Sequence, residues 1–296
     1  MSTYLITTGD ADGIGLEVTL KALKKIKPKK SEKFVFFSER PAKKSAKLSK
    51  HSYPIEDSIH QALGNPAPII NFQSTESPVD WVLTAGSLCQ QHGYAMITGP
   101  LSKQLISQSG HSSVGHTGLL KSLTDSTEVF MYFIGKYFNV ALLTGHCQIN
   151  EVTEQINRSK IELLVQYLKQ FNYKKIALLG LNPHAGDDGV ISKFDSEVLK
   201  PIVSKLGIAG PLVPDVAFMK PNWKKYDAYI ACYHDQGLIP FKMIHGFESG
   251  VHISLGLPFV RTSVDHGTAK DIFGKNKAQY NSMLLAIKTA QRLSNK

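Results

Sequence analysis

Short apolar runs alternate with longer amphipathic stretches through most of the 296 residues, and this alternation constrains the fold more than any other feature. Apolar runs of four or five residues predict buried strands, at residues 4–8, 34–37, 94–98, 176–179 and 229–232. Apolar residues at helical spacing predict helices, at residues 16–26, 79–91, 154–171, 196–206 and 278–293. Two further apolar runs flank Gly135 and Lys136, which predicts a hairpin. Strands that alternate with helices favour an α/β fold with a largely parallel sheet.

Other classes of protein do not fit the sequence. No apolar run approaches the roughly 18–20 residues that a membrane-spanning helix needs. The N-terminus lacks a basic segment followed by an apolar one, so a secretion signal is not predicted. The three cysteines, Cys89, Cys147 and Cys232, form no CxxC pair and no even set, so we expect a protein of the reducing cytoplasm.

The net charge of +10 is concentrated in one segment. Residues 21–50 contain eleven lysines and Arg40 against Glu32 and Glu39, which accounts for the whole excess. Such a basic patch can bind nucleic acid or another anionic surface. The segment has a single arginine, however, and its three phenylalanines lie in a strand-like run rather than exposed for base stacking. We therefore interpret it as a lysine-rich face in contact with solvent, with nucleic-acid binding as the remote alternative.

Three apolar runs each end in a histidine: VALLTGH at His146, IALLGLNPH at His184 and AYIACYH at His234. In open α/β sheets, ligands bind outside the carboxyl ends of the strands, so the three side chains could converge there. Three neutral imidazoles would bind zinc or a similar divalent ion and leave one coordination position for substrate. Each histidine could equally cap a strand or hydrogen-bond a loop, and the residues alone leave both interpretations open.

Several polar residues could take part in chemistry beside these runs. Asp235 follows His234 directly, and Asp215 lies in the loop GPLVPD. Either carboxylate could be a general base or a metal ligand, or only a cap. His116 and Thr117 begin an apolar helix after the motif TGPLSK. Backbone donors at a helix start, a hydroxyl and the lysine of that motif would together suit an anion, although an ordinary helix start is as good an interpretation.

Lys242 and Arg261 are cations inside otherwise apolar stretches, GLIPFK and GLPFVRTS. Charges in such surroundings are paired or directed at a ligand, and the forked donors of arginine suit a carboxylate or a phosphate. A standard dinucleotide-binding fingerprint is absent, because Gly13 and Gly15 are not followed by a third glycine at Val18.

Six motifs occur in one order along the chain: TGDADGIGLE, TGPLSK, GHTGLL, GLNPHAG, YHDQG and GLPFVRTSVDHGTA. Together they resemble the 4-hydroxythreonine-4-phosphate dehydrogenase family of pyridoxal phosphate biosynthesis, over about residues 4–290. The loop HGTAKDIFG also resembles the nucleotide loop of isocitrate and isopropylmalate dehydrogenases, whose fold that family shares. The resemblance implies two α/β/α lobes with a cleft between them. Residues 1–100 and 251–296 would form the nucleotide lobe, and residues 101–250 the metal and dimer lobe.

The resemblance also implies an activity: metal-dependent oxidation of 4-phosphohydroxy-L-threonine by NAD or NADP, with decarboxylation to 3-amino-2-oxopropyl phosphate. A divalent ion (zinc, magnesium or cobalt) would be bound by His146, His184 and His234. Two of these histidines would come from one subunit and the third, His234, from its partner, so the active site would need a homodimer. The ion would polarise the substrate oxygen as a Lewis acid and stabilise the enolate formed on decarboxylation.

The family's other site residues fall on single positions of this chain. Substrate contacts map onto His116, Thr117, Asp215, Lys242 and Arg261, with His252 next to the substrate pocket. The candidate catalytic residues are Asp215, Asp235 and Lys242. The adenosine end of the cofactor would lie against Asp265, His266, Gly267 and Thr268.

Departures from the family pattern leave the substrate open. His252 stands where the family usually has asparagine, and an imidazole is larger than an amide and titrates near neutrality. The first motif reads GDADGIGLE in place of GDPAGIGPE, and the chain is shorter than is usual in its N-terminal half. The alternative is therefore the same fold and chemistry on another four-carbon phosphorylated hydroxy acid, such as erythronate 4-phosphate.

Overall fold

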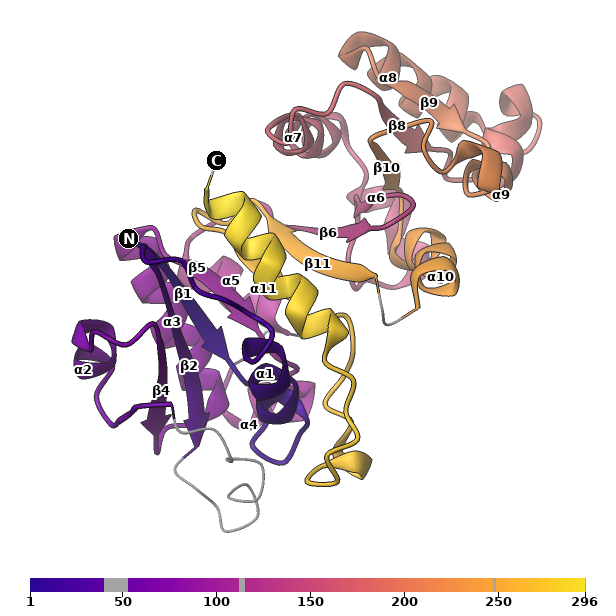
Figure 1. The fold of residues 1–296 in the computed structure, drawn as a ribbon. Helices are drawn as coiled ribbons and strands as arrows, with labels where there is room; N and C mark the ends of the chain where they lie inside the picture. Colours follow the sequence, from indigo (N-terminus) through magenta and orange to yellow (C-terminus); the bar gives the residue numbers. More distant parts are fainter. Residues whose placement is uncertain (40–52, 112–114, 247–248, 296) are drawn as a thin grey trace. The chain divides into compact units, whose positions relative to one another are not determined.

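A largely parallel sheet forms the centre of unit 1, which comprises Met1–Val129 and Val251–Lys296 of the computed structural model (Figure 1). The structure describes residues 1–39, 53–111, 115–246 and 249–295. Neighbouring strands of the sheet run parallel, except that β11 and β12 are antiparallel. In spatial order the strands are β3 (Ile55–Glu56), β4 (Ile69–Ser74), β2 (Glu32–Glu39), β1 (Ser2–Thr7), β5 (Ala95–Thr98), β12 (Arg261–Ser263) and β11 (Gly250–Leu255).

The helices at residues 59–64, 78–92 and 116–123 bury apolar side chains in a core that includes Leu5, Val35 and Trp81. The start of α3 follows from its sequence: Ser77 and Asp80 form a capping box, and Pro78 occupies the first turn. Gly93, with a φ of +67°, ends the helix. The helical segments are α1 (Gly15–Leu23), α2 (Ile59–Gly64), α3 (Pro78–His92), α4 (Lys103–Gln108), α5 (His116–Leu123), η6 (Lys270–Ile272) and α11 (Asn281–Ser294).

Unit 2, which comprises Phe130–Gly250, is also built around β-strands. Its first two strands are the antiparallel hairpin that the sequence predicts, and the others run parallel. The spatial order is β6 (Phe130–Gly135), β7 (Val140–Leu142), β10 (Ala228–Ala231), β8 (Ile176–Leu179) and β9 (Ala209–Leu212). The predicted α/β class with a largely parallel sheet is therefore confirmed in both units.

The helices of unit 2 are more broken than the sequence predicts. The single helix expected at residues 154–171 is two, because Ile156 is extended and Asn157 caps the second helix by accepting from the Lys160 amide at 2.9 Å. The helical segments are η2 (Ile149–Glu151), α6 (Val152–Gln155), α7 (Arg158–Lys169), η3 (Pro183–Gly189), η4 (Phe194–Leu199), α8 (Lys200–Leu206), α9 (Pro214–Ala217), η5 (Lys220–Asn222) and α10 (His234–His245). Within the described ranges, no helix has both the length and the apolar character that a membrane crossing requires.

The chain passes from unit 1 to unit 2 later than the sequence-based estimate of residue 100. Residues 101–129 pack with unit 1, because Ile106 and Leu119 contact Val79 and Leu120 joins the cluster around Trp81. The return at residues 250 and 251 coincides with the boundary estimated from the sequence.

The basic segment is only partly a solvated face. Lys33 is buried and donates to the carbonyl oxygens of Leu63 at 2.6 Å and of Asn65, at the end of α2. Lys21 donates to Glu17 at 2.7 Å. Five other lysines of the segment are exposed as expected, namely Lys24, Lys25, Lys27, Lys29 and Lys30. The cations at positions 40–50 lie outside the described residues.

Candidate functional site

The three histidines of the apolar runs lie at one edge of the unit 2 sheet. Strands β7, β10 and β8 are parallel neighbours, so their carboxyl ends meet at that edge. His146 follows β7, His184 lies in η3 after β8, and His234 begins α10 after β10. The prediction that three strand ends carry the histidines is borne out by these strand bounds.

His146 and His234 lie close enough to share a metal ion. Their ring centroids are 5.0 Å apart. Two imidazoles on one tetrahedral zinc ion, each with its nitrogen about 2.0–2.1 Å from the metal, have centroids on the order of 5 Å apart. The Nδ1 atom of His234 is 2.7 Å from a carboxylate oxygen of Asp235, which directs the other ring nitrogen outward as in many metal sites. The donors present therefore fit a divalent ion.

His184 does not join this pair within one chain. Among the residues described, no three His, Cys, Asp or Glu side chains lie together as a metal site. Within the chain, the His234 ring lies beside that of His146, and the contribution of His234 by a partner subunit stays a prediction. His184 is exposed and starts a left-handed turn in which five successive φ values, from His184 to Asp188, lie between +46° and +81°. Such values are strained for residues other than glycine, and strain of this kind is often found at functional sites.

Two residues that the sequence analysis missed hold the strand ends in place. Asp195 is fully buried and accepts from the Leu181 amide at 2.6 Å and the Asn182 side chain at 2.7 Å, just before the left-handed turn. Gln236 accepts from the Cys232 amide and donates to the Gly180 carbonyl, both at 2.7 Å. Asp195 sits at the edge of a predicted surface helix, so nothing in its spacing indicated burial.

A buried cation forms a second polar group, in unit 1. The guanidinium of Arg261 on β12 donates to Ser254 at 2.9 Å and Thr98 at 2.5 Å, and no carboxylate pairs with it in the described part of the chain. Its Nε atom is buried with no hydrogen-bond partner. Burial lowers the pKa of Arg261 to about 9, so the side chain is still a cation at neutral pH. A buried charge that lacks a counter-charge is a strong indication of an anionic ligand.

His116 and His252 lie in the same group. His116 opens α5, and its buried Nε2 atom has no hydrogen-bond partner. Burial, and to a smaller extent the charge of Arg261, lowers the pKa of His116 well below 6.5, so its imidazole is neutral. The Nδ1 atom of His252 is 3.3 Å from Arg261 Nη1 and 3.4 Å from Ser263 Oγ. Because arginine can only donate, that nitrogen acts as the acceptor.

The loop expected to contact a nucleotide is tied to the rest of unit 1. Asp265 accepts from the Ser282 hydroxyl at 2.7 Å, while its own amide donates to that hydroxyl at 3.2 Å. The Thr268 carbonyl accepts from the Ile14 amide at 3.0 Å. His266 has a buried Nε2 atom without a partner, and a Cβ added at Gly267 would meet no atom within 4 Å. The segment is therefore held to unit 1 at Asp265 and Thr268 and still has open space beside Gly267. Because His266 Nδ1 donates to the Gly267 carbonyl at 3.0 Å, the unpartnered Nε2 atom of the neutral ring is an acceptor.

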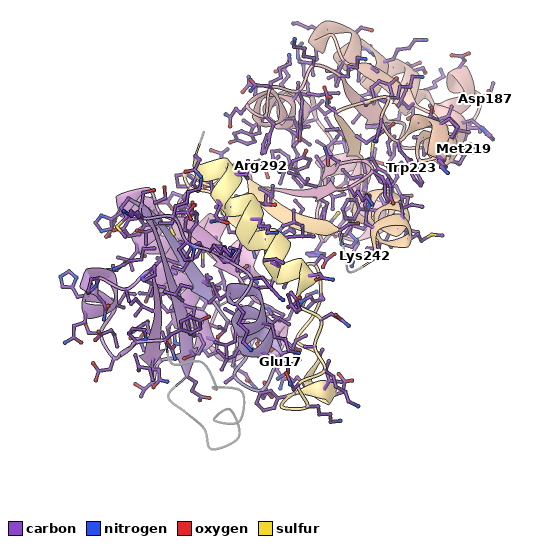
Figure 2. All side chains as sticks on the ribbon, in the orientation of Figure 1. Glu17, Asp187, Met219, Trp223, Lys242 and Arg292 are labelled. Carbon is purple, nitrogen blue, oxygen red and sulfur yellow. The ribbon has the colours of Figure 1, made fainter. Side chains whose placement is uncertain are left out.

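Of the remaining candidates, Asp215 and Lys242 are on the surface of unit 2 and Thr117 is in unit 1. Asp215 is in the first turn of α9, which packs beside η3 and its His184. Lys242 lies on the exposed face of α10 (Figure 2). Neither side chain makes a hydrogen bond or an ion pair with any residue that the structure describes. Thr117 follows His116 in the first turn of α5.

Comparison with known proteins gives a consistent result. The family model for "Pyridoxal phosphate biosynthetic protein PdxA" matches residues 7–290. The chain is 37% identical to the 4-hydroxythreonine-4-phosphate dehydrogenase of Sulfurihydrogenibium sp. (strain YO3AOP1), over 98% of each protein. It is 36% identical to the D-threonate 4-phosphate dehydrogenase of Pectobacterium atrosepticum, over 68% of this chain and 65% of that one.

Solved structures agree with this result. A crystal structure of 4-hydroxythreonine-4-phosphate dehydrogenase from Klebsiella pneumoniae has a TM-score of 0.82 and 28% identity, and the match covers 100% of this chain and 98% of that one. An isocitrate dehydrogenase from Methylococcus capsulatus matches 99% of this chain and 86% of its own, with a TM-score of 0.54 and 15% identity. The second likeness shows a shared fold, as expected for an isocitrate dehydrogenase-like architecture.

Proposed function

The chain belongs to the PdxA family of pyridoxal phosphate biosynthetic proteins, whose relatives are dehydrogenases, and from that premise we propose that it oxidises 4-phosphohydroxy-L-threonine. The oxidant is NAD or NADP, and the product is 3-amino-2-oxopropyl phosphate after decarboxylation. The observation that carries the proposal is the buried guanidinium of Arg261, which has donors but no counter-charge among the described residues.

Arg261 and His116 provide the recognition of substrate charge. The forked guanidinium can bind two oxygens of a phosphate or carboxylate, and its Nε atom needs an acceptor. The neutral His116 adds a further hydrogen-bonding nitrogen beside it, at the start of a helix where backbone amides favour anions. An anion bound there would offset the cost of burying the arginine, so binding and charge burial support each other.

The strand-end histidines provide the metal site. A divalent ion, when bound, would supply Lewis-acid polarisation of the substrate's hydroxyl oxygen. His146 and His234 would hold it, with Asp235 orienting the His234 ring. Asp235 is therefore assigned to orientation, and Asp215 and Lys242, whose side chains are exposed, are the candidates for proton transfer.

The loop from Asp265 to Thr268 would receive the adenosine end of the nicotinamide cofactor. The support for this assignment is the open space over Gly267 and the buried, unpartnered Nε2 atom of His266. Hydride transfer itself is the chemistry of the nicotinamide, and the protein contributes binding and orientation.

A homodimer would complete the metal site. The chain brings His146 and His234 together, and among the described residues no third ligand side chain forms a metal group with them, so we propose that a histidine of a second subunit completes the site. We propose that the second subunit covers exposed apolar side chains on the surface of unit 2, of which Val190 is 84% and Met243 78% exposed. Asp187 of η3 and Met219 after α9 lie on neighbouring elements of that surface (Figure 2).

D-threonate 4-phosphate is the second candidate substrate, because a 36% identical relative bears that name and His252 stands at the position where the family usually has asparagine. His252 offers an acceptor to Arg261 and is larger than asparagine. If it sets the preference, His252→Asn shifts the ratio of kcat/KM values toward 4-phosphohydroxy-L-threonine. An unchanged ratio assigns specificity to other residues.

The direct test is reduction of NAD or NADP by purified protein with a divalent ion and 4-phosphohydroxy-L-threonine. We expect turnover that is lost in Arg261→Met and retained in Arg292→Met, which removes an exposed arginine of α11. Absence of turnover with either phosphorylated acid, at saturating metal and cofactor, overturns the proposal.

A further inference from the structure

The ammonium of Lys270 lies between two carboxylates from the other end of the sequence. Its Nζ atom is 2.9 Å from Asp12 and 3.1 Å from Asp10, in the turn that follows β1. These two hydrogen-bonded carboxylates, that of Asp12 foremost, raise the pKa of Lys270. Lys270 comes two residues after Thr268, at the start of η6. The ion pairs therefore join the loop proposed to bind the cofactor to the β1–α1 turn.

The two carboxylates have different roles. Asp10 is buried, and its Oδ1 atom accepts from the Ser102 amide at 2.8 Å, at the N-cap of α4. Its Oδ2 atom is also buried and has no other hydrogen-bond partner, so Lys270 supplies its counter-charge. Asp12 is 63% exposed and stands where the family pattern GDPAGIGPE has alanine. The second ion pair is thus a feature of this chain.

Other contacts fix the far end of the same loop independently. Glu17 on α1 accepts from the Ala278 amide at 2.8 Å, and Figure 2 shows Glu17 beside the loop that leads to α11. Lys21, which also pairs with Glu17, donates to the carbonyls of Asn276 at 3.1 Å and Ala278 at 2.9 Å. At the near end, the Ile14 amide donates to the Thr268 carbonyl at 3.0 Å.

Between these anchors the loop has few constraints of its own. Ala269 and Asn276 have positive φ values, and the side chains of residues 274–277 are exposed. A segment of this kind samples many conformations unless contacts hold it, and ordering it during binding would weaken affinity. Asp265 is hydrogen-bonded to Ser282, and the only ion pairs at the near end of the loop, among the residues described, are those of Lys270.

We infer that Lys270 is a positioning residue that clamps the start of the loop 265–278 onto Asp10 and Asp12, so that a nicotinamide cofactor meets a preformed loop. The inference rests on the proposed function for the identity of the ligand, but the clamp itself is a property of the protein alone. Lys270 touches neither substrate nor reacting atoms in this role. Its removal therefore changes cofactor binding and leaves the chemical step intact.

The test compares four variants of the full-length protein. Lys270→Met removes both ion pairs, and Asp12→Asn removes only the exposed one, which avoids stranding the buried Asp10 carboxylate. Lys270→Arg retains a cation and serves as the conservative rescue. Lys275→Met is the control, because it removes an exposed lysine of the same loop for which the described residues provide no ion pair.

Hydrogen exchange of the ligand-free protein measures directly how firmly Lys270 holds the start of the loop. We expect the Ile14 amide, which donates to Thr268, to exchange at least about tenfold faster in Lys270→Met and measurably faster in Asp12→Asn. The Ala278 amide, held by Glu17 at the other end, should change less. Lys270→Arg and Lys275→Met should match the wild type. An Ile14 exchange rate unchanged in both Lys270→Met and Asp12→Asn overturns the clamp.

Steady-state kinetics then measures how the loss of these ion pairs changes cofactor binding. We expect the KM for NAD to rise about tenfold in Lys270→Met, with kcat changed less than about twofold. An unchanged KM for NAD, in a variant whose loop exchanges faster, overturns the link to cofactor binding. If the wild-type protein reduces neither NAD nor NADP, the proposed function fails together with that link, while the exchange measurement still decides the clamp.

Discussion

The side-chain amide of Gln236 donates to the carbonyl oxygen of Gly180 at 2.7 Å and so links the ends of two neighbouring strands. The same side chain accepts from the Cys232 amide. Its two hydrogen bonds therefore link β10 to β8 just beyond the last residues that pair through their backbones. One strand end leads to His234 and the other to His184. Gln236 therefore positions the histidines that we propose as metal ligands.

Replacement of this amide should weaken metal binding more than it weakens the fold. Gln236→Met keeps the volume but removes both hydrogen bonds, and loss of such supporting contacts typically lowers metal affinity about 10–100-fold. Equilibrium titration of metal-free protein with Co²⁺ would measure the change. Gln170→Met, at an exposed position after α7, is the control and should bind like the wild type. Equal Co²⁺ affinities in the wild type and both variants would show that Gln236 supports the fold and does not position the metal ligands.

Asp195 should contribute strongly to stability. In Asp195→Ala the Leu181 amide and the Asn182 side chain lose their acceptor, and an unsatisfied buried donor costs about 1–3 kcal/mol. We expect the free energy of unfolding in urea to fall by that amount or more. Asp187→Asn alters an exposed carboxylate of the nearby turn and should leave the free energy of unfolding unchanged. A loss below about 0.5 kcal/mol in Asp195→Ala would contradict the buried network.

Periodicity and strand-end placement were enough to predict the α/β class, the hairpin and the common edge for three histidines. Buried strands differ from amphipathic helices in period, and that signal is local. The residues that complete the site depend on contacts distant in sequence. Lys270 meets Asp10 across most of the chain, and no local pattern distinguishes it from the other lysines of its loop.

The basic segment illustrates the same limit. A lysine-rich stretch is normally interpreted as exposed to solvent. Lys33, however, lies on β2 and donates to a carbonyl oxygen at the end of α2, where the last carbonyl groups of the helix need donors. Burial follows from the sheet register and not from composition. The sequence alone showed that His252 stands where the family usually has asparagine. The contact between His252 and Arg261 depends on the antiparallel pairing of β11 with β12, which the sequence did not show.

His245 should make stability depend on pH. Its Nδ1 atom donates to the Phe241 carbonyl at 3.0 Å and its Nε2 atom accepts from the Tyr137 amide at 3.1 Å, which requires the neutral ring. Burial lowers the pKa of His245 below 6.5. Because the unfolded chain binds this proton more readily, the stabilisation is complete above about pH 6.5 and is lost as the pH falls toward the lower native pKa.

The measurement is the free energy of unfolding between about pH 7 and pH 5 for the wild type and for His245→Gln. The wild type should lose stability more steeply over this range, because the variant has no group to protonate. His60→Gln, at an exposed position on α2, should keep the wild-type slope. Parallel curves for the wild type and His245→Gln would contradict the prediction.

The fork of Arg261, and not only its charge, should be needed for substrate binding. Arg261→Lys keeps a cation but cannot donate to Thr98, Ser254 and a bound oxyanion with the same planar geometry. We expect the KM for 4-phosphohydroxy-L-threonine to rise at least about tenfold, equivalent to about 1.4 kcal/mol of binding. The KM for NAD should stay the same, since the cofactor loop is anchored elsewhere. Arg292→Lys provides the matched control on α11, and a similar KM for substrate in both variants would show that charge alone is sufficient.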